Sequence, residues 1–292
     1  KDFDLRTTAL LHPAIEFFKE IGIWEKYRST AQALNSLVIC NLNKNSEIID
    51  AKCEFFAKDL NLGTLGYNLP NYTILNKLQE LLRSEKNFRY FSGDCIENIT
   101  PRSFDIVART KTTDKIISKL IIAADGKYSK IREISKIRNF KYDYNQSALV
   151  FTIKHEYNHE SKSYEIYESE GPCTLVPVKT KKFNGHYSSV VLMQNNFGTE
   201  QKIGKNDDML SNFITKRTGN ILGECKVETP AMKFPIISQV SKSLTAERII
   251  LLAESAHVLP PIGAQGLNTS IHDIINLTAL IKKKLNKDEQ IG

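Results

Sequence analysis

Apolar residues recur at helical spacing in three stretches of the chain. Residues 71–82 and 267–285 each carry an apolar stripe three or four positions apart, which predicts two amphipathic helices. Residues 13–21 predict a third helix, because Pro13 suits a first helical turn and Gly22 suits the position after the last one.

Shorter apolar runs predict strands. They lie at residues 37–41, 88–91, 104–109, 116–124 and 247–253. From about residue 141 to residue 240, aromatic residues, threonines and turn residues alternate as they do in an antiparallel sheet. The strands predicted there are residues 147–154, 163–167 and 188–194.

This order of elements predicts an α/β (α+β) fold in which a domain of mixed helices and strands is interrupted by a mainly antiparallel β domain. We expect the interrupted domain to comprise residues 1–36, 68–138 and 243–292. We expect the β domain to comprise residues 37–67 and 139–242.

Composition narrows the function classes. The 292 residues are 41% hydrophobic and 25% charged, which are globular values. The net charge of +7 comes mostly from scattered lysines, and no nucleic-acid motif accompanies it, so we expect no nucleic-acid partner. The basic surface is compatible with anionic lipid. Five distant cysteines without a CxxC motif indicate reduced thiols in a cytoplasmic protein, with no metal site.

The first candidate site is the junction at residues 119–133. An apolar strand ends at Asp125 and Gly126, and Ser129 suits the N-cap of a helix that contains Arg132. Ligands bind at strand ends of open α/β sheets, where an aspartate accepts from a hydroxyl and a glycine admits a ligand to the backbone. The alternative is an ordinary strand–turn–helix connection.

The second junction, residues 248–268, has a richer pattern. A strand ends at Glu254, prolines stiffen the loop, and Gly263 and Gly266 leave bare backbone before a helix. The positive end of the helix suits a negative charge on a ligand. His257 is more often a packed loop histidine than a catalyst.

The two junctions together, DGKYSKIR (125–132) and AESAHVLPPIGAQGLN (253–268), resemble motifs of the class A flavoprotein aromatic monooxygenases of the p-hydroxybenzoate hydroxylase fold. Within that family the chain is most similar to the ubiquinone-biosynthesis ring hydroxylases. Supporting stretches are LRTTAL (5–10), LGYNLPNYTILNKLQELL (65–82), GPCTLVPV (171–178) and KFPI (233–236).

The resemblance implies a Rossmann-like FAD-binding domain interrupted by a substrate-binding β domain. It also implies hydroxylation of a polyprenyl phenol by NAD(P)H and O2 through a flavin hydroperoxide. We expect peripheral contact with the inner face of the membrane and contact with other ubiquinone-biosynthesis proteins. No acid–base catalyst is assigned. The implied cofactor-binding residues are Arg6, Gln79, Asp125, Gly126, Arg132, Glu254, Pro261, Gly263, Gln265, Gly266, Leu267 and Asn268.

The chain departs from the family pattern in three places. Where the family has a glycine–aspartate pair, this chain has Ala253 and Glu254. Where the family has a Gly-x-Gly pair, this chain has Ala264 and Gln265 between its two loop glycines. No GxGxxG motif occurs, so the resemblance implies that the unit carrying it precedes residue 1. Two alternatives therefore stay open: a related flavin oxidoreductase acting on another aromatic compound, and a degenerate, non-catalytic member of a quinone-synthesis assembly.

Overall fold

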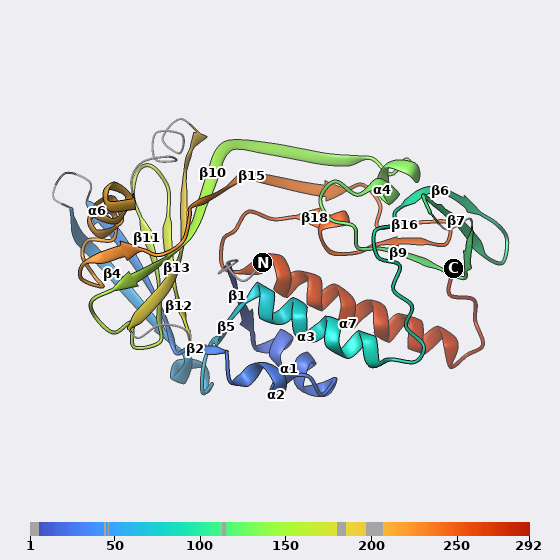
Figure 1. Ribbon diagram of the computed structural model, residues 1–292, viewed down its shortest axis with the longest axis horizontal. Helices are drawn as coiled ribbons and strands as arrows, with labels where there is room; N and C mark the ends of the chain where they lie inside the picture. The colour runs from blue at the N-terminus through green and yellow to red at the C-terminus, as the bar shows by residue number, and fades with distance from the viewer. Residues whose placement is uncertain (1–5, 44, 46, 113–114, 180–184, 197–206) are drawn as a thin grey trace. The chain divides into compact units, whose positions relative to one another are not determined.

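The computed structural model describes residues 6–43, 45, 47–112, 115–179, 185–196 and 207–292 (Figure 1). The chain divides into two compact units, Lys1–Ser84 with Tyr144–Ile236 and Glu85–Asp143 with Ile237–Gly292. The mixture of helices with antiparallel and parallel strands confirms the predicted α/β class.

The first unit is built on one large sheet. The sheet includes β15 (Met232–Ser241), which neighbours β10. The other strands lie in the order β10 (Asn139–His155), β13 (His186–Asn195), β12 (Cys173–Val178), β11 (Lys162–Tyr167), β3 (Ser36–Asn43) and β4 (Ile48–Phe56), with β14 (Cys225–Val227) also on β10. These pairs are antiparallel except β11 with β3. Alternation along β3 buries Val38, Cys40 and Leu42, and α6 (Asp207–Arg217) adds Leu210 and Ile214 to the same core.

A smaller sheet, three α-helices and one 3-10 helix also belong to the described part of the first unit. The sheet has the order β1 (Thr7–Leu11), β5 (Gly66–Pro70) and β2 (Gln32–Leu34), and the other elements are α1 (His12–Glu20), α2 (Trp24–Arg28), η1 (Ala57–Leu60) and α3 (Asn71–Ser84). In α1 the spacing of Ala14, Ile15 and Phe18 buries one face.

The second unit contains two three-stranded sheets. One has the order β6 (Ile96–Pro101), β7 (Ile106–Thr110) and β8 (Ile116–Ser118), and the other β16 (Thr245–Ala246), β17 (Ile249–Leu251) and β9 (Ile121–Ala123). The remaining elements are α4 (Lys130–Ile134), η2 (Ala253–Ser255), β18 (His257–Val258), which pairs with the end of β15 (Met232–Ser241), and α7 (Gln265–Leu285). Isoleucines and alanines of β7, β9 and α4 join Leu251 of β17 in one core.

Most predicted elements are confirmed within one or two residues, including the helices at 13–21, 71–82 and 267–285. Three predictions are wrong. Residues 88–91 form no strand, and residues 116–124 form two short strands, because β8 pairs with β7 whereas β9 pairs with β17. Helix α6 lies in the stretch that was predicted to be mainly β.

The predicted division into a cofactor domain and a substrate domain stays a prediction, because it divides the chain by function. By compactness, residues 1–36 and 68–84 group with the large sheet. Among the described helices, none combines the length and the apolar content that a membrane crossing requires.

Candidate functional site

Two strand ends meet at one edge of the β16–β17–β9 sheet in the second unit. β9 and β17 are parallel, with Ile121 opposite Ile249, so the chain leaves both strands at the same edge. A side-chain carbon placed on Gly126 would lie 4.0 Å from Glu254 Oε2. The structure therefore brings together the two junctions that the sequence analysis selected.

The first junction satisfies its own polar groups. Ser129 Oγ accepts a hydrogen bond from the Arg132 backbone N–H at 3.0 Å, as an N-cap does. Asp125 Oδ2 accepts from the Ile131 N–H at 3.1 Å. Gly126 has a φ of 83°, which explains a glycine at the turn. The Asp125 side chain thus helps to start α4.

Arg132 joins the two junctions. Its side chain is buried, and its Nη1 donates to the Ser255 carbonyl at 2.7 Å while its Nη2 donates to the Lys127 carbonyl at 2.9 Å. A charged donor shared between two backbone carbonyls makes strong hydrogen bonds. The cofactor-binding role implied for Arg132 stays a prediction, and the observed contacts make this side chain a brace between the junctions.

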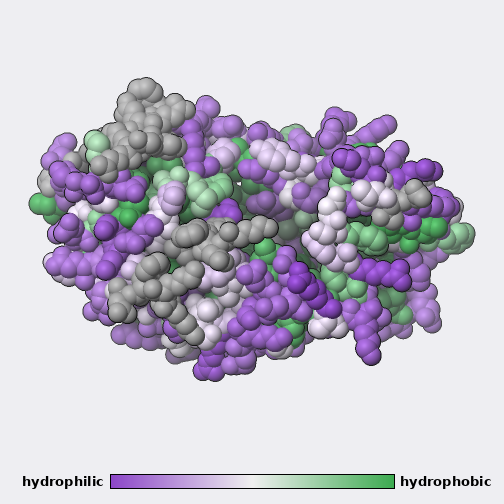
Figure 2. Space-filling model, viewed as in Figure 1, coloured by the Kyte–Doolittle hydropathy of each residue, from purple (hydrophilic) through white to green (hydrophobic). Residues whose placement is uncertain are grey.

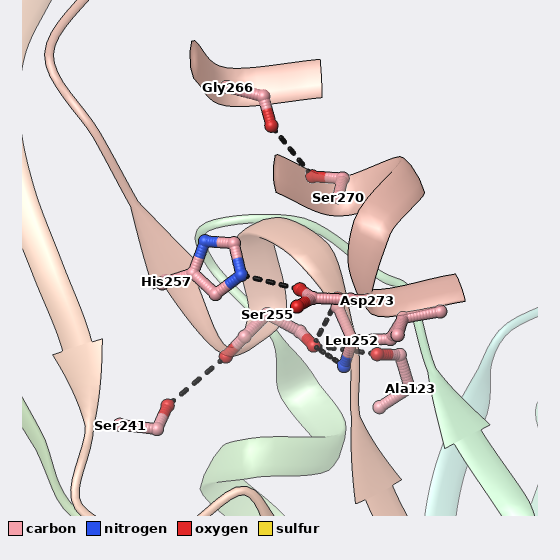
Figure 3. A network of polar contacts seen from close by, with 8 residues as sticks. All are labelled: Ala123, Ser241, Leu252, Ser255, His257, Gly266, Ser270 and Asp273. Atoms are coloured by element: carbon pink, nitrogen blue, oxygen red, sulfur yellow. Dashed lines mark hydrogen bonds and ion pairs between the residues drawn. The ribbon is translucent and has the colours of Figure 1, made fainter. Parts of the chain in front are cut away.

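Ser255 is the centre of a polar network that the sequence analysis missed (Figure 3). This fully buried hydroxyl lies 2.6 Å from the Ala123 carbonyl and 2.8 Å from the Leu252 carbonyl, and it accepts from the Leu252 N–H at 2.9 Å. Ser241 Oγ donates to the Ser255 carbonyl at 3.3 Å. The network ties the end of β9 to η2, and its only sequence signal is a small hydroxyl residue after a strand.

His257 and Asp273 form a separate pair, drawn with these contacts in Figure 3. His257 Nε2 and Asp273 Oδ2 lie 2.6 Å apart, which links β18 to the third turn of α7. Both side chains are partly buried. The pair fixes the two ends of the glycine-containing loop, so His257 is a positioned loop histidine, as the sequence favoured.

The loop between β18 and α7 exposes apolar surface. Leu259, Ile262 and Leu267 are all exposed, and so is Pro261. The loop's side-chain hydrogen bonds are local: Gln265 Nε2 donates to the Gly263 carbonyl at 3.2 Å. Apolar side chains clustered at a strand–helix junction, with little packing of their own, are typical of a ligand surface.

The first turn of α7 leaves room for a ligand. Ala264 at the N-cap offers no side-chain hydrogen bond to the helix. A carbon placed on Gly266 would meet nothing within 4 Å, so no other part of the structure requires a glycine there. Asn268 Nδ2 donates to the Ala264 carbonyl at 2.7 Å, a contact within the first turn.

Glu254 is the carboxylate that faces this edge without a partner. It is exposed, and among the described residues it makes no hydrogen bond or ion pair. The preceding Ala253 has a φ of 57°, a left-handed conformation that costs an alanine about 1–2 kcal/mol. The backbone therefore has the shape that a glycine prefers, and this position is where the related family carries one.

The other two implied cofactor residues belong to the first unit. Gln79 is exposed on α3, and the Arg6 guanidinium lies 5.5 Å from the centre of the Phe234 ring. Arg6 also borders a cavity of about 130 Å³ beside the large sheet. The cavity is lined by Arg6, Val150, Phe151, Thr152, Thr229, Pro230 and Met232.

The second-unit site fits a flat, anionic cofactor with a hydroxylated chain. Glu254 is placed to accept from hydroxyl groups, the exposed Leu259, Ile262 and Leu267 offer an apolar contact, and the uncapped end of α7 suits a negative charge. In the described part of the chain, no group of three histidine, cysteine or acidic side chains is arranged to hold a metal ion. A flavin combines these properties.

The fold and the site thus define a chain of the FAD-binding class. Residues 5–290 match the family described as FAD binding domain, and the chain belongs to that family. Among solved structures, a probable FAD-dependent monooxygenase, PqsL of Pseudomonas aeruginosa, superposes with a TM-score of 0.79 at 14% identity, covering 97% of this chain and 78% of that one. That likeness supports the fold.

Relatives with similar sequences are named as ubiquinone hydroxylases. UbiL of Rhodospirillum rubrum is 24% identical over 192 residues, 65% of this chain and 43% of that protein. UbiM of Neisseria meningitidis is 19% identical, and the matched region covers 99% of this chain and 62% of UbiM. The 3-demethoxyubiquinol 3-hydroxylase of Escherichia coli is 22% identical, with 93% and 66% covered. The chain spans less than two thirds of the length of these three relatives.

Proposed function

We propose that the protein is an FAD-dependent monooxygenase that hydroxylates the aromatic ring of a polyprenyl phenol in ubiquinone biosynthesis. The observation that carries the proposal is the exposed apolar loop at the uncapped end of α7, with the unpartnered Glu254 beside it. Bound FAD would supply the redox chemistry, with NAD(P)H as reductant and O2 as oxidant.

The residues of this chain would bind and orient the cofactor. The backbone N–H groups at the start of α7 would face a negative charge on the cofactor, and Glu254 would accept hydrogen bonds from its hydroxylated chain. Pro261, Gly263, Gln265, Gly266, Leu267 and Asn268 form the loop and first turn against which the ring would lie. Holding donors in a fixed position where charge develops is the usual protein contribution to such reactions.

The cavity of the first unit supports an aromatic or isoprenoid substrate. Its volume, about 130 Å³, is close to that of an engineered apolar cavity of roughly 150 Å³ that binds benzene. Its walls include Val150, Phe151 and Met232, which favour an apolar group, and Arg6 gives it one positive side chain. We assign to it part of the path taken by the substrate.

Two measurements test the proposal. The first is the absorption spectrum of the purified protein, which should show the bands of bound flavin. The second is incubation with NAD(P)H, O2 and a short-chain prenyl phenol, with mass spectrometry of the product. One added oxygen atom and coupled NAD(P)H oxidation are expected. Bound flavin with hydroxylation of a different aromatic compound would favour the related-oxidoreductase alternative.

A non-catalytic role in a quinone-synthesis assembly is the second candidate, because Ala253–Glu254 replaces the family's glycine–aspartate pair. Ala253 has a φ of 57°, a left-handed conformation that a glycine adopts more readily than an alanine. A protein that binds ubiquinone-biosynthesis partners but retains no flavin would favour this candidate.

Peripheral contact with an anionic membrane belongs to the leading proposal, since a polyprenyl phenol resides in lipid.

A further inference from the structure

The connection between α3 and β6 is an exposed loop rich in aromatic residues (Figure 1). Within it, Phe88, Tyr90 and Phe91 have 40%, 70% and 48% of their surface exposed. The Phe88 and Tyr90 rings stack with their centroids 6.5 Å apart. On the face drawn in Figure 2, hydrophobic residues form small patches among hydrophilic ones, and single exposed apolar residues need no explanation. Three exposed aromatic residues within four positions form a cluster that does need an explanation.

The aromatic residues of this loop serve no purpose in the fold that the structure shows. All three are exposed, and none is in the clusters that the described residues form. Residues 88–91 have the composition of a strand, yet no strand of the described chain pairs with them. A cluster of exposed aromatic side chains, unlike a single one, lowers solubility, so its presence indicates a partner that covers it.

Hydrogen bonds fix the base of the loop, and the side chains at its tip are exposed to solvent. Asp94 Oδ1 accepts from the Cys95 and Thr112 backbone N–H groups, at 2.8 and 3.0 Å. Hydrogen bonds from the Thr110 and Thr112 hydroxyls further lower the pKa of Asp94. A turn bond from the Phe88 N–H to the Glu85 carbonyl begins the loop. The aromatic tip is thus presented from a fixed base.

The charge of the tip is positive. Lys86 and Arg89 alternate with the aromatic residues, and residues 86–93 contain no acidic side chain. Both are exposed, and neither forms an ion pair with any residue that the structure describes. The whole chain carries a net charge of +7, which adds to the attraction for a negative surface.

We propose that residues 86–91, the aromatic–basic loop, dock the protein on an anionic lipid surface. Aromatic side chains favour the region between lipid headgroups and acyl chains, and each nearby Lys or Arg adds attraction to anionic lipid. A protein partner fits less well, because a stable protein interface uses about 20–30 residues a side, and this loop offers six. A lipid surface needs only a few inserted side chains and complementary charge.

This inference rests on the membrane contact in the proposed function and gives it a location. The test is co-sedimentation of the protein with phosphatidylcholine vesicles, with and without phosphatidylglycerol. Binding should require the anionic lipid and fall as salt rises. The Phe88→Ala/Tyr90→Ala/Phe91→Ala variant and the Lys86→Glu/Arg89→Glu variant should each lose binding by roughly tenfold or more.

Matched variants keep the test specific. Phe104→Ala removes an exposed aromatic residue of the same unit, and Lys282→Glu/Lys283→Glu reverses two exposed charges on α7. Both should bind vesicles within about twofold of the parent protein. All variants should unfold at the parent's temperature, because every altered side chain is exposed.

A spectroscopic measurement locates the contact independently of affinity. In a Tyr90→Trp variant, the added tryptophan should shift its emission to the blue on vesicle addition and be quenched by brominated lipid. Trp24 is buried and supplies a constant background, and Phe104→Trp is the matched control that should not respond. No vesicle binding by the parent protein would overturn the membrane contact and the inference together, while leaving the hydroxylation assay to judge the reaction. Equal binding by the loop variants, or capture of a protein at the loop without vesicle binding, would overturn the inference alone.

Discussion

The two strand–helix junctions of the second unit lie side by side, yet they use their polar groups differently. At the first, Asp125, Ser129 and Arg132 all make hydrogen bonds within the structure. At the second, Glu254 has no partner among the described residues, and the loop before α7 exposes apolar side chains. The two junctions therefore have different roles. The first stabilises the structure around the strand ends, and the second is open to a ligand.

This difference has an energetic side. A buried polar group must find a partner within the protein, because an unsatisfied one costs about 1–3 kcal/mol. Arg132 and Ser255 meet that requirement together and fix the position of η2. The open junction can then keep an unpaired carboxylate and bare backbone at the surface, where water satisfies them until a ligand binds.

The largest effect is expected from removing the shared brace. Arg132→Met keeps an apolar side chain of similar length but leaves the Ser255 and Lys127 carbonyls without their charged donor. The free energy of unfolding should fall by about 2–4 kcal/mol, as measured by urea denaturation. Lys130→Met, an exposed change on the same helix, is the control and should change it by less than about 0.5 kcal/mol. Equal effects in the two variants would show that Arg132 does not brace the junctions.

Substitution of Gly266 distinguishes a role in ligand binding from a role in folding. Because a carbon at this position meets nothing within 4 Å, Gly266→Ala should stabilise the flavin-free protein by up to about 1 kcal/mol. The same change should weaken FAD binding by roughly tenfold, about 1.4 kcal/mol, and Gly266→Val should abolish flavin retention. Thermal unfolding without flavin and a fluorescence titration with FAD measure the two effects.

The control for Gly266 lies further along α7. Thr278→Ala also raises helix propensity, at an exposed position away from the first turn, and should leave FAD binding unchanged. If Gly266→Ala binds FAD as well as the parent protein does, the first turn of α7 is not where the ring lies.

The two junctions could be predicted from the sequence, but the difference in how they use their polar side chains could not. Helices α1, α3 and α7 and most strands follow from local periodicity, and the glycine and proline pattern marked the loop before α7. The use of Arg132 and Ser255 depends on the parallel pairing of β9 with β17, between residues that are far apart in the chain. Residues 88–91 show the converse error, because a strand requires a partner that composition does not reveal.

A smaller effect is expected at Ala253, which precedes the open junction. Because its φ is 57°, Ala253→Gly should remove a left-handed strain, offset in part by the greater freedom of glycine in the unfolded chain. The net gain in unfolding free energy should be about 0.5–1 kcal/mol. Ala256→Gly, at a φ of −92°, should instead destabilise the protein by about 1 kcal/mol or more. The same sign for both changes would contradict this account of the junction's backbone.

An effect of about the same size concerns the carboxylate that distinguishes the open junction. The related family carries aspartate where this chain has Glu254, and the extra methylene displaces the carboxylate by more than about 1 Å. If the longer side chain makes a poorer hydrogen bond to the hydroxylated chain of FAD, Glu254→Asp should tighten FAD binding by roughly 1 kcal/mol, about fivefold. Glu254→Gln keeps the length and loses the charge, so it should bind more weakly than either carboxylate. Isothermal titration with FAD ranks the three proteins. An aspartate variant that binds no better than the parent protein would mean that the loop is already adjusted to glutamate, and that Glu254 is no mark of a degenerate site.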